Sequence, residues 1–246
     1  MITLKSQCYK SCNVANWCIT VLFMLILLGG CASFFGGKKE ETPASLMQKG
    51  LKLMDDGRYK SATEIFQKIR DRYPYSKFAI DSELKIADSL FKMESYEESY
   101  NAYNEFERLH PRNPNIPYVV FQKGMCYFER VSTIDRDQLS TLRAKEEFDR
   151  LIKKYPHSQY DYSARRKIRK CYISMIEHEL YVGRFYYKME KYSAAKCRFK
   201  YVINNYPDIG QYHVALEYLN KCNNKLNTGE EPQVSWWHKL IHPFAD

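Results

Sequence analysis

The residue whose type and position best suit covalent chemistry is Cys31, because its thiol follows Leu28, Gly29 and Gly30 at the end of an apolar run. The run covers residues 19–28 and holds no charged residue, while two lysines and no acid lie upstream of it. That order of basic, apolar and small residues is typical of a cleaved export signal. The run is about half of the roughly 20 residues that a membrane-spanning helix needs. We therefore expect residues 1–30 to be removed as a signal peptide.

The order Leu-Gly-Gly-Cys resembles the lipobox of bacterial lipoproteins. The resemblance implies that a diacylglyceryl group is attached to the Cys31 thiol, that cleavage occurs before it, and that the new amino terminus is acylated. An ordinary export signal that happens to end near a cysteine is the alternative. Residues 31–43 are small and charged without periodicity, and we interpret them as a flexible tether from the lipidated cysteine.

The formal net charge of +9 would suit nucleic acid in a cytoplasmic protein. An exported, lipidated chain rarely meets nucleic acid, so we expect no nucleic-acid partner. Acidic protein faces or anionic envelope polymers are the expected partners for the excess charge.

The other candidates for chemistry predict no catalytic, metal or cofactor site. His238 and His242 are four residues apart, but no third ligand is close in sequence. No glycine-rich phosphate loop, nucleophile motif or Cys-x-x-Cys pair occurs, so we predict that the protein is not an enzyme. Four further cysteines lie among apolar neighbours, where cysteine behaves as a small hydrophobic residue, and their disulfide state stays open: Cys126, Cys171, Cys197 and Cys222.

Two groups of basic residues are candidates for binding a partner protein. The first is residues 165–170, in which Arg165, Arg166 and Arg169 stand with two lysines. Five cations within two helical turns indicate an acidic partner, although the solvated side of a helix is the alternative. The second is Arg198, which stands between two inward-facing positions and should project sideways from its helix. Arginine is the usual residue of interface ion pairs, and an ordinary surface position is again the alternative.

The helices that must position these residues can be read from a repeated pattern. A tyrosine is followed by a small residue three positions on, an aromatic residue seven positions on and a proline fifteen positions on. The pattern occurs three times, and a further block keeps all but its tyrosine: Tyr59, Ala62, Phe66, Pro74; Tyr96, Ser99, Tyr103, Pro111; Tyr192, Ala195, Phe199, Pro207; and Ala144, Phe148, Pro156. Nine positions before the three tyrosines stand Gly50, Ala87 and Gly183.

This is the tetratricopeptide pattern of two antiparallel helices and a turn. The small residue of the first helix lets the second approach closely, and the proline stops the next helix from running on. We therefore predict an all-α fold, a tetratricopeptide-repeat superhelical solenoid of about nine helices over residues 44–226. Residues 131–138 are an insertion in the third block, and residues 162–189 read as one long helix or as two stacked end to end near Gly183.

The last predicted helix covers residues 212–226, with either Ala215 or Leu216 facing inward. Residues 227–246 then form a Trp-rich tail. Because the end of a solenoid needs covering, the tail is expected to cap the last helix. Docking on a partner or on the membrane interface, where tryptophan is favoured, is the alternative.

The segments that join the repeats resemble those of the BamD family, the tetratricopeptide lipoproteins of the outer membrane β-barrel assembly machinery. Residues 110–118 match the family's Pro-x-x-Pro-Asn-Ile-x-Tyr segment, and Gly124 follows at the family spacing. Residues 155–160 read Tyr-Pro-His-Ser-Gln-Tyr, and residues 71–74 match the end of the family's first repeat. The resemblance covers roughly residues 28–226.

The resemblance implies a non-enzymatic subunit that is anchored by lipid to the outer membrane and faces the periplasm. Its C-terminal half would dock on the periplasmic domains of the barrel-forming assembly protein, and its N-terminal repeats would receive unfolded outer membrane proteins. Arg198 aligns with a basic position of that docking half. A pilotin-like or cell-wall-linked repeat lipoprotein is the alternative function, because such chains also carry tetratricopeptides after a lipobox.

Overall fold

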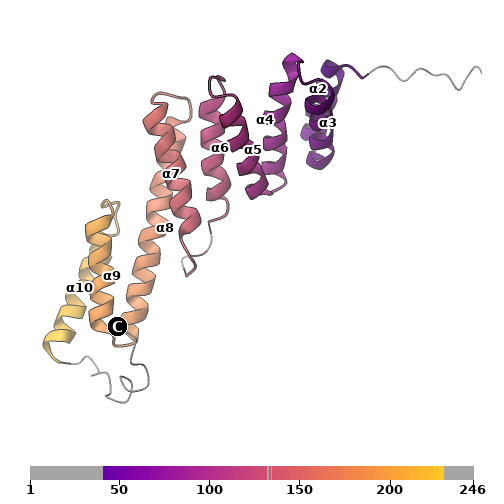
Figure 1. The fold of residues 1–246 in the computed structure, drawn as a ribbon. Helices are drawn as coiled ribbons and strands as arrows, with labels where there is room; N and C mark the ends of the chain where they lie inside the picture. Colours follow the sequence, from indigo (N-terminus) through magenta and orange to yellow (C-terminus); the bar gives the residue numbers. More distant parts are fainter. Residues whose placement is uncertain (1–40, 132, 134, 230–246) are drawn as a thin grey trace, which may run out of the picture. The chain divides into compact units, whose positions relative to one another are not determined.

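The computed structural model describes residues 41–131, 133 and 135–229. This part of the chain folds into nine α-helices and contains no strand, which confirms the predicted all-α fold (Figure 1). The helices are α2 (Pro43–Asp55), α3 (Tyr59–Arg72), α4 (Lys77–Lys92), α5 (Tyr96–Leu109), α6 (Ile116–Phe128), α7 (Leu139–Lys154), α8 (Asp161–Lys188), α9 (Tyr192–Asn205) and α10 (Tyr212–Asn227). None of the described helices is both long and apolar enough to cross a membrane.

The chain divides into two units, residues 1–45 and 46–246. In the described end of the first unit, the Ser45 backbone N–H donates to the Thr42 hydroxyl at 3.2 Å. In the second unit, each helix from α3 to α10 packs on its neighbour in the chain. These successive contacts are those of a helical-repeat array.

The small residues of the repeat pattern lie where the paired helices approach most closely. A Cβ atom added to Gly50, Gly124 or Gly183 would lie 2.5 to 2.7 Å from the nearest ring atom of the phenylalanine on the next helix. Those phenylalanines, Phe66, Phe148 and Phe199, are fully buried. The glycine and the aromatic residue are therefore one steric unit, as the spacing predicted.

The turns within three of the helix pairs share one backbone conformation. The residue two positions before the tyrosine that begins the second helix has a positive φ: 73° at Gly57, 61° at Glu94 and 59° at Glu190. Left-handed backbone favours glycine because a Cβ atom is crowded there. The two glutamates are thus held in a strained conformation by the helices on either side.

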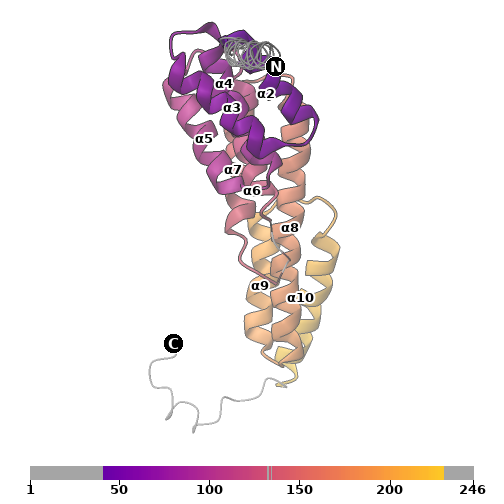
Figure 2. The same cartoon turned by 90° about the vertical axis from the view of Figure 1, so that its right-hand side faces the viewer.

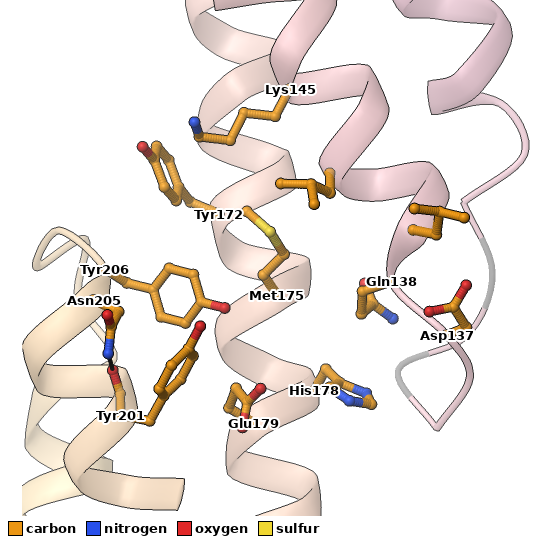
Figure 3. A pocket seen from close by; sticks show the side chains of 12 residues that line it. Asp137, Gln138, Lys145, Tyr172, Met175, His178, Glu179, Tyr201, Asn205 and Tyr206 are labelled. Atoms are coloured by element: carbon orange, nitrogen blue, oxygen red, sulfur yellow. Dashed lines mark hydrogen bonds between the residues drawn. The ribbon is translucent and has the colours of Figure 1, made fainter.

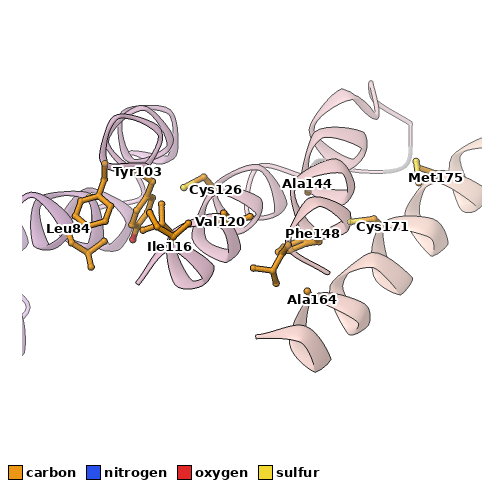
Figure 4. Packing of buried hydrophobic residues seen from close by; sticks show 14 residues of the cluster. Leu84, Tyr103, Ile116, Val120, Cys126, Ala144, Phe148, Ala164, Cys171 and Met175 are labelled. Carbon is orange, nitrogen blue, oxygen red and sulfur yellow. The ribbon is translucent and has the colours of Figure 1, made fainter. Parts of the chain in front are cut away.

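The long helix α8 is continuous over 28 residues. The segment is therefore one helix and not two helices stacked end to end near Gly183. In its first half, Cys171 and Met175 belong to the core cluster that also contains residues of α4 to α7 (Figure 4). In its second half, Ile176 and Leu180 belong to a separate cluster with α9 and α10. Figure 2 shows α7 beside one half of α8, and α9 and α10 beside the other. The buried side of α8 therefore changes along its length, and the helix joins two cores.

A buried ionic network ties α5, α6 and α7 together. The Lys123 ammonium, 5% exposed, donates to the Asn104 side chain at 2.7 Å and to Glu107 at 3.0 Å. Arg150 donates to Glu107 and to Glu147, each at 2.6 Å. Burial alone would raise the pKa of Glu107, but the hydrogen bonds from Arg150 and Lys123 lower it to about 2.

In the last helix, Ala215 is buried and Leu216 is exposed, so Ala215 is the inward residue of the two alternatives. Cys222 is buried on the same side of α10. Cys126 and Cys171 are buried free thiols, and burial raises their pKa to about 11 and about 12. Cys197 is an exposed free thiol.

Candidate partner-binding face

Arg198 lies on α9 and projects sideways, with its side chain 45% exposed. Its NH1 group donates to the Glu179 carboxylate of α8 at 3.2 Å. Among the described residues, Glu179 is the one acceptor of a hydrogen bond from Arg198. Because a guanidinium carries five N–H donors, Arg198 can donate to further acceptors.

Glu179 is the residue that holds Arg198, and the sequence interpretation missed it. Its side chain is 12% exposed, and a buried carboxylate is costly unless a cation or hydrogen bonds compensate it. Glu179 stands four residues after Met175 and three before Val182, in phase with the inward side of the predicted helix. An acid at an inward position was the available signal that a cation from another helix lies opposite.

The three arginines at the start of α8 each make a separate contact. Arg165 donates to Asp161 at 2.9 Å, one turn earlier on the same helix. The Arg166 guanidinium lies 5.9 Å from the Tyr162 ring, and Arg169 donates to the Ile209 carbonyl at 3.5 Å. The three arginines are exposed, as both alternatives for this group require.

The basic residues 165–170 do not lie beside Arg198. Arg169 and Glu179 are ten residues apart on α8, which corresponds to about 15 Å along a helix. Lys167, which the charge pattern grouped with the arginines, lies partly buried with its ammonium 4.0 Å from the Phe128 ring centre. Burial lowers the pKa of Lys167.

A cavity of about 440 Å³ lies between the start of α7, the middle of α8 and the end of α9 (Figure 3). Glu179 forms part of its wall, so the cavity adjoins the site of Arg198. Aromatic, aliphatic and polar side chains line it: Asp137, Gln138, Leu139, Leu142, Lys145, Tyr172, Met175, His178, Glu179, Tyr201, Asn205 and Tyr206. Such a mixture of apolar walls and a few polar groups is usual in binding sites.

Lys145 and Tyr206 are two polar residues of the cavity wall whose surroundings are defined. The Lys145 ammonium donates to Asp149 at 2.7 Å and lies 5.0 Å from the Tyr172 ring centre. Burial, with the nearby Tyr201 and Glu179, raises the pKa of Tyr206 to about 12, so its hydroxyl stays neutral at physiological pH.

A second hollow, of about 330 Å³, is lined by residues of α2, α4 and α6. Met47, Leu51 and Phe78 supply its apolar surface. Lys85 and Tyr118 on its wall both donate to Asp88, at 2.9 and 2.8 Å. The hollow therefore combines an apolar surface with a fixed polar network.

Several sequence-based hypotheses fall outside the described residues: the signal peptide of residues 1–30, lipidation of Cys31, the tether up to residue 40, the pair His238 and His242, and the Trp-rich tail beyond Gly229. Within residues 41–131, 133 and 135–229, no group of three or more histidine, cysteine, aspartate or glutamate side chains is arranged to hold a metal ion.

Helix pairs that pack a glycine against a buried phenylalanine, repeated along the chain, define a tetratricopeptide-type repeat protein. Comparison with known families gives a match of residues 39–235 to YfiO, described as an outer membrane lipoprotein. The chain belongs to this family.

Three curated relatives share the name outer membrane protein assembly factor BamD. The protein of Rickettsia prowazekii is 35% identical over 187 residues, which cover 76% of this chain and 74% of the relative. The protein of Caulobacter vibrioides is 28% identical over 221 residues, covering 87% and 72%. The protein of Neisseria gonorrhoeae is 26% identical over 192 residues, covering 74% and 71%. These matches confirm the resemblance found in the sequence.

Proposed function

We propose that this chain is a lipid-anchored scaffold subunit of the outer membrane β-barrel assembly machinery, and that it is not an enzyme. Its C-terminal half docks on the periplasmic domains of the barrel-forming subunit, and its N-terminal repeats receive unfolded outer membrane proteins. The observation that carries the proposal is the family match over residues 39–235, with relatives named as outer membrane protein assembly factors.

The anchor is the lipid on Cys31, which remains after residues 1–30 are removed. A single acyl chain binds a membrane only marginally, whereas two or more give stable anchoring. Residues 31–43 then act as a tether that keeps the repeats near a partner in the same membrane. The tether thereby raises the effective concentration of the repeats around that partner. The folded array faces the periplasm.

The docking face is centred on Arg198. Helix α9 carries Lys196, Arg198 and Lys200 but no acidic residue, so it favours an acidic surface on the partner. Arg198 is exposed and retains donors for a partner carboxylate. Arg165, Arg166 and Arg169 are exposed at the start of α8 and add weaker contacts that salt screens.

The receiving site for unfolded clients is the hollow lined by α2, α4 and α6. Met47, Leu51 and Phe78 can cover an apolar side chain, while Lys85 and Tyr118 offer polar contacts to an extended backbone. The first helices of successive repeats supply these residues, and in repeat proteins such helices commonly form the surface that holds extended segments.

Charge reversal at Arg198 tests the docking proposal. Arg198→Glu should weaken binding of the purified periplasmic domains of the barrel-forming subunit about tenfold or more, because an attractive ion pair becomes repulsive. The control is Lys60→Glu, which reverses an exposed cation on α3, outside the C-terminal half of the chain. Binding is measured by biolayer interferometry at several salt concentrations. Equal affinity of both variants would return Arg198 to the ordinary surface.

A further inference from the structure

The second half of α8 carries a strip of exposed apolar side chains on the side away from its buried residues. Tyr181, Phe185 and Met189 follow one another at intervals of four residues and are 43%, 54% and 55% exposed. Ile176 and Leu180 of the same half are buried in the core cluster that contains residues of α9 and α10. Residues four apart lie on one side of a helix, so the three side chains form an apolar strip about 12 Å long. Exposed apolar surface that is concentrated in this way is characteristic of interaction sites.

The C-terminal tail of the chain starts close to this apolar strip. Helices α8, α9 and α10 alternate in direction, so α10 ends at the same end of the bundle as α8 (Figure 2). The rings of Tyr187 and Tyr218, with centres 5.6 Å apart, join these two helices. Trp236 follows Gly229 by seven residues, and an extended segment of that length spans up to about 24 Å. A helix with its side chains is about 10–12 Å wide, so the tail is long enough to pass around the end of α8.

The apolar residues of the tail suit the strip. Trp236, Trp237, Leu240 and Ile241 have the spacing of one apolar helix face. A tryptophan buries about 150–250 Å² when it is covered, so leaving two in water is costly. The outer side of α10 is a poorer surface for them, because Leu216 is the one exposed large apolar side chain on that helix.

The charges of the two segments are complementary as well. Glu230 and Glu231 begin the tail, directly after the last described residue. The end of α8 and the turn after it present the exposed cations Lys188 and Lys191 against one acid, Glu190. Opposite charges at the edge of an apolar contact contribute mainly to its orientation. The two glutamates therefore favour a path of the tail along the end of α8.

We infer that residues 230–246 fold back over the end of α8, and that Trp236 and Trp237 cover the apolar strip. The occupant of the strip is thus the chain's own C-terminal tail, which covers α8 and not the outer side of α10. The contact removes apolar side chains of both segments from water and closes the end of the repeat array. The inference does not depend on the proposed function, and its test involves no binding partner.

Tryptophan fluorescence can report on the tail alone. The tryptophans of the sequence are Trp17, Trp236 and Trp237. The purified chain would carry Trp17→Phe, so that all tryptophan emission comes from the tail. We expect emission at a shorter wavelength than that of a free tryptophan peptide, together with weaker quenching by acrylamide, because the indole rings are covered.

Substitutions in the strip then test which surface covers the tail. Phe185→Gln and Met189→Gln should each shift the emission to longer wavelength and increase acrylamide quenching, because the strip loses an apolar contact. Leu216→Gln is the matched control, since Leu216 is 47% exposed on α10 and outside the strip. It should leave both readouts unchanged. Circular dichroism verifies the fold of each variant, and the spectra are recorded at several protein concentrations.

Each outcome either supports or overturns the inference. Short-wavelength emission that responds to Phe185→Gln and Met189→Gln but not to Leu216→Gln, at every concentration, supports it. Emission of water-exposed tryptophan in the unchanged chain overturns it, and so does a response to Leu216→Gln alone, which would place the tail on α10. Loss of the short-wavelength emission on dilution would indicate a second copy of the chain as the cover. A short-wavelength emission that none of the three variants changes would indicate a micelle or another surface, and both of these results overturn the inference.

Discussion

Replacing Gly183 by alanine tests how the second half of α8 supports α9 and thus Arg198. The added Cβ atom would lie 2.7 Å from Cε1 and 2.8 Å from Cζ of Phe199. The Phe199 ring is fully buried and stacks on Tyr218 with ring centres 5.1 Å apart, so it has little room to retreat. Either the ring or the helix must therefore move.

The expected magnitude follows from two opposing effects. Overpacking a well-filled core costs about 1–3 kcal/mol, and the two contacts below 3.0 Å at Gly183 place this substitution in the upper part of that range, at about 2–3 kcal/mol. Alanine is favoured over glycine inside a helix by about 1 kcal/mol, which offsets part of that cost. The net destabilisation of Gly183→Ala is then about 1–2 kcal/mol, which corresponds to a Tm lower by about 2–8 °C for a domain of this size.

Thermal and urea unfolding followed by circular dichroism measures this change. Ser163→Ala, at an exposed position of the same helix, controls for the effect of alanine itself. A further Phe199→Leu substitution should cost less in the Gly183→Ala chain than in the unchanged chain, because it removes the clashing ring atoms. A Gly183→Ala chain that is as stable as the original would refute the steric account of the glycine and phenylalanine pairs.

Three further predictions concern the ionic network around Glu107, the turn at Glu94 and the lipid anchor on Cys31. Glu107→Gln should destabilise the fold by about 3 kcal/mol at pH 7. The pKa of Glu107 is lowered from its usual 4.5 to about 2, so the ionised carboxylate stabilises the fold above pH 4.5. That contribution is lost as pH falls from 4.5 toward 2, so urea unfolding should show a smaller difference at pH 3; a difference independent of pH would contradict this account. Glu94→Gly should raise stability by about 0.5–1 kcal/mol, because Glu94 has a φ of 61°, and an unchanged urea midpoint would show that its turn is unstrained. Cys31→Ser should leave the chain unlipidated and move it to the soluble fraction, and normal membrane retention of this variant would refute the lipid anchor.

The arrangement of helices was predictable because the repeat pattern encodes a steric fit. Gly50 and Phe66 belong to one helix pair, only sixteen residues apart, and their sizes are complementary whatever the rest of the chain does. The same spacing placed Gly183 against Phe199. Local size and period were therefore sufficient for the fold and for the phase of its helices.

The details of the partner-binding face were less predictable, because they depend on how separate helix pairs meet. The apolar pattern of residues 162–189 fits one helix as well as two, and the packing of its two halves on different cores decides for one. Glu179 was a visible irregularity in that pattern, but its pairing with Arg198 depends on the register of α8 against α9. The cavity depends on where α7 begins relative to α8 and α9.

The central claim is that this chain is a subunit of the β-barrel assembly machinery, and native co-purification tests it most directly. The full lipidated chain would be purified in mild detergent from its own host, and the proteins bound in stoichiometric amounts would be identified by mass spectrometry. We expect an outer membrane β-barrel protein that carries periplasmic repeat domains. Recovery of secretin, pilus or cell-wall proteins in its place, without a barrel protein, would contradict the account.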